Sequence, residues 1–165
     1  MHAKIIIAAA ISMLAASAAA APYEAPYALT AVHADFQAQL EQAATTPGEI
    51  GTAARLAAEL MATQNAEQER LVMPLLGHAE VTATGQALTD VDLSGQAQSL
   101  EAELRRVSEG DAELVAALVE LYAAAEDAGQ AEIARLAERV IWHETSDVEV
   151  LYPTALLVRS AAQAR

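Results

Sequence analysis

The sequence predicts an all-α protein, folded as an antiparallel up-and-down bundle of four helices. Three observations support this fold class. Strong helix formers such as Ala, Leu, Glu, Gln and Arg dominate the 165 residues, which include one Phe and one Trp. Apolar residues recur at spacings of three and four in four segments, as on the buried face of a helix. Short turn-like stretches at 45–48 and 127–130 join these segments in pairs, so the two members of each pair should run antiparallel.

The first half of the chain is expected to form two of these helices. They should span residues 29–42 and 47–76. The buried face of the first should hold Leu29, His33, Phe36 and Leu40. The buried face of the second should hold Ala57, Leu60, Met61, Gln64, Gln68, Leu71 and Leu75. Because Pro74 has no N–H to donate, we expect it to kink the second helix near its end.

The second half is expected to form the other two helices, after a glycine-containing connector over residues 77–96. The third helix should span residues 97–126, with Gly110 as a point where it can bend. Its buried face should hold Leu100, Leu104, Val107, Leu114, Leu118 and Leu121. The fourth should begin near Ala131 and be kinked at Pro153. It should bury Ile133, Leu136, Val140, His143, Asp147, Val150, Thr154 and Leu157.

The N-terminal residues have the layout of a secretory signal peptide. Lys4 precedes an apolar, Ala-rich run, and small residues around Ala20 offer a cleavage site. We therefore expect residues 1–20 to be removed, residues 21–27 to form an extended lead-in, and residues 28–163 to form the bundle. The apolar run is short for a membrane span, so the cleaved protein should be periplasmic or secreted and free of the membrane.

Composition excludes several classes of function. The chain has no Cys, which rules out thiol catalysis and a disulfide framework. A formal net charge of −14, without a basic stretch, argues against nucleic acid and anionic membranes as partners. A nucleophile elbow, a phosphate-binding glycine loop and a Cys/His zinc pattern are all missing from the sequence. The residues therefore favour a binding protein over an enzyme.

A repeated pattern links the second and fourth helices. His143 and Asp147 precede Pro153, and Gln64 and Gln68 stand at the same distances before Pro74. Residues at i and i+4 share one helix face, so the two side chains of each pair can contact the same ion or the same group. This repetition indicates a duplicated helix pair in which only the second copy carries ionisable groups.

The polar residues on the buried faces are the candidate functional residues. A buried polar group without a partner costs a few kcal/mol, so these groups must meet one another, water or a cation. His and carboxylate on facing helices are common ligands of a metal in a bundle core. His33, His143 and Asp147 are therefore candidate ligands of one divalent metal ion, and the other interpretation is a metal-free, hydrogen-bonded set. Gln64 and Gln68 should hydrogen-bond each other or the histidines, with weak metal coordination as the alternative.

With these residues the chain resembles the hemerythrin-like (HHE cation-binding) family over roughly residues 28–160. His33 matches the histidine of the family's first helix, and His143 with Asp147 matches the motif of its fourth. The resemblance implies a non-haem iron centre that serves oxygen or nitric-oxide binding, or metal handling. Gln64, Gln68 and Leu104 stand where the family has ligands, so its full two-iron centre is not expected.

Three functional hypotheses follow. The first is an exported hemerythrin-like protein that binds one non-haem iron or another divalent metal, with a small diatomic molecule as its further ligand. The second is a structural or protein-interaction module that uses no cofactor and has lost the site. The third, an iron oxygenase built on two His and one carboxylate, lacks any substrate pocket that the sequence reveals.

Overall fold

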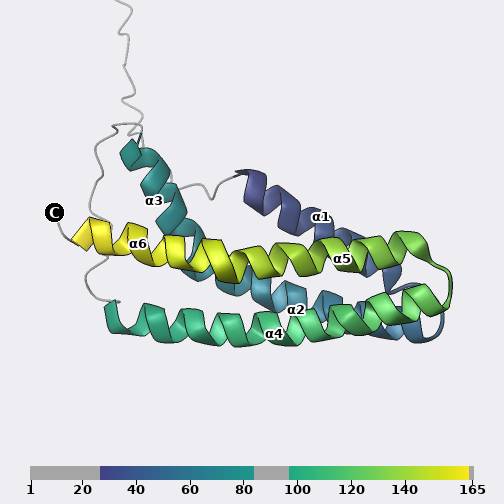
Figure 1. Cartoon of the computed structure of the whole chain (residues 1–165). Coiled ribbons are helices and arrows are strands. Elements are labelled where there is room, and N and C mark those ends of the chain that lie inside the picture. The colour runs from purple at the N-terminus through teal and green to yellow at the C-terminus, as the bar shows by residue number, and fades with distance from the viewer. Residues whose placement is uncertain (1–26, 84–96, 164–165) are drawn as a thin grey trace, which may run out of the picture.

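The computed structural model describes residues 27–83 and 97–163, and within each of these two ranges the helices follow one another directly or across a short turn (Figure 1). The elements are α1 (Tyr27–Ala43), α2 (Glu49–Leu71), α3 (Met73–Ala83), α4 (Ala97–Asp127), α5 (Ala131–Ser146), the π-helix η2 (Asp147–Leu151) and α6 (Tyr152–Gln163). The all-helical class is thus confirmed for the described residues, which contain no strand. The predicted signal peptide, and the lead-in except for Tyr27, lie outside them.

The helices pack side by side around a common core. α2 lies along α4, α4 lies along α5, and α1 packs mainly on α2 with a smaller contact to α5 (Figure 1). α4 and α5 are joined by the predicted turn, where Gly129 adopts a φ of 67° that suits glycine. None of the described helices combines the length and the apolar character that crossing a membrane would require.

The core is divided into two apolar clusters by a polar layer. One cluster includes Leu40, Met61, Leu114, Leu118, Leu121, Leu136 and Val140. The other includes Leu71, Val72, Leu75, Leu100, Leu104, Val107, Tyr152 and Ala155. Between them along the helices lie the buried polar residues Gln64, Gln68, Asp111, Glu144 and Asp147. Leu104 belongs to an apolar cluster, so its place on the third predicted buried face is confirmed.

The second predicted helix is kinked near Pro74, as expected, with a break of one residue at Val72, which keeps helical φ and ψ. α2 ends at Leu71 and α3 begins at Met73, and α3 leaves the line of α2 (Figure 1). Pro74 explains the position of the break, because its ring clashes with the preceding turn and it lacks an N–H. α4, in contrast, continues through Gly110 as one helix.

The fourth predicted helix changes its buried face after Asp147. Val150 and Leu157 were expected inside but are 63% and 70% exposed, and Thr154 is exposed as well. The residues buried instead are Tyr152, Ala155 and Arg159. The reason is η2, since a π-turn holds about one residue more than an α-turn and so rotates everything after it by roughly 100°. Pro153 favours this irregularity because it cannot donate the hydrogen bond of a regular helix.

Candidate metal centre

The structure brings the three predicted ligands together. His33 comes from α1, His143 from α5, and Asp147 is the first residue of η2. Asp147 Oδ2 lies 3.8 Å from His33 Nε2 and 3.8 Å from His143 Nε2. Each residue offers one ligand atom within 4.8 Å of the other two, in an arrangement that could hold a metal ion. His33 and Asp147 are buried and His143 is mostly buried.

The three ligand atoms would have to move closer together to bind a transition metal. In a site with bonds of about 2.1 Å, neighbouring ligand atoms lie roughly 3.0–3.4 Å apart. The two 3.8 Å separations are a few tenths of an ångström longer, and all three ligand atoms lie within 4.8 Å of one another, so rotation of the side chains would have to close the gaps. Within the described structure, His143 Nε2 is buried without a hydrogen-bond partner, so a ligand atom is free. Phe36 packs edge-on against the His143 ring, 5.4 Å between centroids, and closes one side of the site.

The charge state of His33 also suits metal binding. Burial, assisted by the nearby His143, lowers the pKa of His33 to about 4, so its ring is neutral at neutral pH. A metal needs the neutral imidazole as its ligand. The same pKa means that the 3.8 Å approach of His33 to Asp147 is not an ion pair at pH 7, although its distance would allow one. Burial raises the pKa of Asp147, while His143 and the hydrogen bond from Gln68 act against that rise.

Gln64 and Gln68 do not hydrogen-bond each other or the histidines in the described structure, so that prediction is wrong. Gln68 Nε2 donates to Asp147 Oδ2 at 2.8 Å and to the Tyr152 hydroxyl at 3.0 Å. Gln64 Nε2 donates to Glu144 Oε2 at 3.2 Å and to the same hydroxyl at 3.0 Å. The amides therefore connect the Asp147 carboxylate to a wider buried network.

Three members of this network were missed by the sequence analysis: Asp111, Glu144 and Tyr152. They are 2%, 1% and 4% exposed, respectively. Asp111 follows Val107 and precedes Leu114 at helical spacing, and Glu144 follows Val140 by four, so both carboxylates could have been found on their apolar faces. Tyr152 could not, because only the π-helix rotates it inward.

Burial alters the ionisation of the Asp111 and Glu144 carboxyl groups. Burial, reinforced by Asp111 and Asp147, raises the pKa of Glu144 to about 8. Burial also raises the pKa of Asp111 to about 7, against the hydrogen bond from Tyr152 and with Asp147 adding to the rise. Near neutral pH Glu144 is therefore mostly protonated, which avoids placing three buried negative charges side by side.

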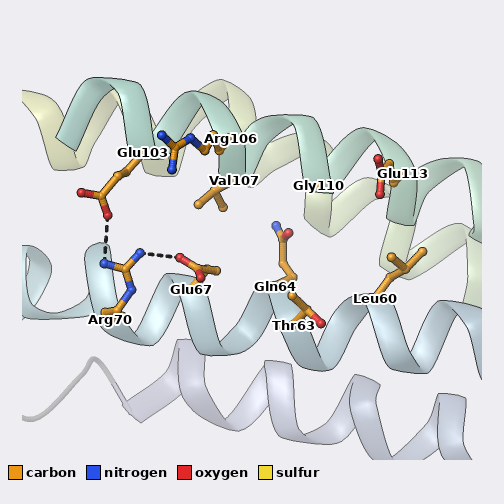
Figure 2. A pocket seen from close by; sticks show the side chains of 10 residues that line it. All are labelled: Leu60, Thr63, Gln64, Glu67, Arg70, Glu103, Arg106, Val107, Gly110 and Glu113. Atoms are coloured by element: carbon orange, nitrogen blue, oxygen red, sulfur yellow. Dashed lines mark hydrogen bonds and ion pairs between the residues drawn. The ribbon is translucent and has the colours of Figure 1, made fainter. Parts of the chain in front are cut away.

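A surface groove borders the network between α2 and α4. Its volume is about 270 Å³. Figure 2 shows Gln64 pointing from α2 toward α4 beside Gly110, and Arg70 bonded to Glu67 and Glu103 at one end. Gln64 thus lies both in the groove wall and in the buried network.

Replacing Gly110 with alanine should stabilise the protein. A Cβ at this position would lie 3.6 Å from Gln64 Oε1, which is an ordinary contact. Glycine in a helix interior costs about 0.5–1 kcal/mol relative to alanine, and the variant should recover about that amount. Urea unfolding of the metal-free protein measures the change. A loss of stability would mean that the Gln64 side chain cannot accept the contact.

Comparison with known proteins does not extend this description: no family model matches the chain, and neither a curated protein nor a solved structure matches it. The resemblance to the hemerythrin-like family therefore stays a prediction from the residues quoted above.

Proposed function

We propose that this protein binds one divalent transition-metal ion through His33, His143 and Asp147. The observation that carries the proposal is the convergence of these side chains from three helical segments, with Asp147 Oδ2 3.8 Å from a nitrogen of each histidine. The neutral ring of His33 and the unpartnered Nε2 of His143 support it. Two His and one carboxylate leave coordination positions open, which suits iron(II) in particular.

The role that we propose for this metal is binding a small diatomic molecule such as oxygen or nitric oxide, or metal handling. Open positions on a bound iron would supply the binding chemistry. The protein would hold the ion in a largely buried site, with Phe36 against the His143 ring and Gln68 donating to Asp147. We further propose an antiparallel hemerythrin-like bundle of four helices, exported after loss of residues 1–20, as the setting for this function.

A second candidate function is a metal-free structural or interaction module. The observation that favours it is that Tyr152, Gln64 and Gln68 together hydrogen-bond three buried carboxyl groups within the protein, although Gln68 Oε1 and Asp111 Oδ2 have no partner among the described residues. Such a network is stable without a metal if its carboxyl groups are protonated where needed.

Metal content separates the two candidates. The full chain, produced with iron and zinc in the medium and purified without chelator, should contain close to one metal ion per chain by elemental analysis. Cobalt(II) added to the stripped protein should give visible ligand-field bands that saturate at one equivalent, and should raise the melting temperature. No metal in the purified protein and no saturable cobalt spectrum would contradict metal binding and favour the module.

A further inference from the structure

The Tyr152 hydroxyl occupies the centre of the buried polar layer. It accepts hydrogen bonds from Gln64 Nε2 and Gln68 Nε2, both at 3.0 Å, and donates to Asp111 Oδ1 at 3.2 Å. A phenol has one proton to donate and two lone pairs to accept, so this hydroxyl makes every hydrogen bond available to it. Its orientation is therefore fixed.

This arrangement also fixes the amide of Gln68. Because Asp111 takes the phenol proton, the Tyr152 oxygen faces Gln68 as an acceptor. The amide must then turn its NH₂ group, not its carbonyl oxygen, toward Tyr152. The other N–H of that group donates to Asp147 Oδ2 at 2.8 Å, the same oxygen that lies 3.8 Å from both histidine nitrogens.

The backbone is shaped to bring Tyr152 to this place. In a regular α-helix, residues 143 and 152 would point in opposite directions, since nine steps of 100° place them half a turn apart. The extra residue of η2 reduces the separation by about 100° and brings the phenol onto the face of Asp147 and Glu144. π-turns of this kind are frequent at functional sites.

We propose that Tyr152 is a positioning residue of the metal centre, which holds Asp147 Oδ2 toward the two histidines by way of Gln68. This inference rests on the metal binding proposed above. It goes further, because a tyrosine that only filled the core would contribute its ring and not its hydroxyl. Partners that orient a ligand in this way commonly contribute about 10-fold to 100-fold in metal affinity.

The test is cobalt(II) titration of the full-length Tyr152→Phe variant. We expect the dissociation constant to rise by about 10-fold or more, with a change in the visible ligand-field bands. Tyr122→Phe is the matched control, because Tyr122 is 40% exposed on α4, and it should change neither readout. If Tyr152 acts through Gln68, the double variant Gln68→Leu with Tyr152→Phe should bind no more weakly than Gln68→Leu alone.

The outcomes separate this inference from the proposed function. If the parent protein binds cobalt and Tyr152→Phe binds it equally well with the same spectrum, the positioning role is wrong and metal binding stands. If the parent protein binds no cobalt, both fail.

A second measurement is needed if circular dichroism shows that the Tyr152→Phe variant is unfolded. The full chain is labelled with 3-fluorotyrosine and followed by ¹⁹F NMR as zinc is added. The Tyr152 signal should shift at one equivalent while the Tyr122 signal, identified through Tyr122→Phe, stays in place. An unmoved Tyr152 signal at saturating zinc would overturn the proposal.

Discussion

The His143→Ala variant is expected to lose metal binding, with an affinity for cobalt(II) at least about 100-fold below that of the parent protein. The ring supplies one of three ligand atoms, and its Nε2 has no other hydrogen-bond partner in the described structure. A site reduced to one histidine and one carboxylate is too poor to hold the ion. Titration of the stripped protein, read by the cobalt spectrum, measures the loss.

Two further variants make this result specific. Trp142→Ala changes the neighbouring residue on the same helix, which is 67% exposed, and should leave the affinity unchanged. Asp147→Asn keeps a side-chain oxygen that can accept the hydrogen bond from Gln68, but it removes a negative charge from a buried position. The variant should therefore bind metal more weakly, while the stability of the metal-free protein should not fall. Equal cobalt affinity in the parent and His143→Ala proteins would show that the metal binds elsewhere.

The second large effect is a loss of stability of the metal-free protein as the pH rises from about 5 to about 8. Glu144 has its pKa raised from 4.5 to about 8 by burial. The folded state therefore holds a proton that the unfolded state releases above pH 4.5. The contribution of Glu144 to the free energy of unfolding is therefore fully present below pH 4.5. It is lost as the pH rises through 8. At about 1.4 kcal/mol per pH unit, the loss is roughly 3–5 kcal/mol.

The neighbouring titratable groups also contribute to the dependence of stability on pH. Asp111, with a pKa raised from 3.8 to about 7, adds a loss of the same sign. His33 acts in the opposite direction, because its pKa is lowered from 6.5 to about 4. Its contribution is complete above pH 6.5 and is lost as the pH falls toward 4. Between pH 4.5 and 6.5 the losses from Glu144 and Asp111 together exceed the gain from His33, so the stability should fall as the pH rises throughout this range.

Urea unfolding of the metal-free protein at several pH values measures this curve. Glu144→Gln keeps a hydrogen-bonding group at the site and removes the ionisation, so its stability should fall much less between pH 5 and pH 8. Glu113→Gln on the exposed side of α4 is the control and should follow the parent protein. A parent protein whose stability rises with pH over this range would contradict the burial argument.

The groups that are missing from the site limit what the metal could do. Gln64 and Gln68 stand where the resemblance led us to expect ligands, and both amides use their NH₂ groups within the protein. Leu104 lies in an apolar cluster. The described residues therefore offer one compact ligand set, and the remaining positions on a bound ion would be left for water or a small molecule.

Much of the fold and of the candidate site was predictable, because helical periodicity is a local property. Leu40, Met61 and Leu114 occupy the buried positions that a spacing of three and four assigns to them. The same spacing places His143 and Asp147 on one face, and the inward position of His33 on the first helix completed the trio. The structure brings these three residues together.

What the tertiary structure alone decided lies after Asp147 and across the bundle. The π-helix exposes Leu157 and buries Tyr152, and no local pattern revealed the extra residue in its turn. The partners of Gln68 are likewise set by which helices meet, since they lie 79 and 84 residues away in the sequence. The amino-acid sequence determined which side chains face inward along each regular helix. The packing of the helices determined which of those side chains touch, and so brought the three candidate ligands together.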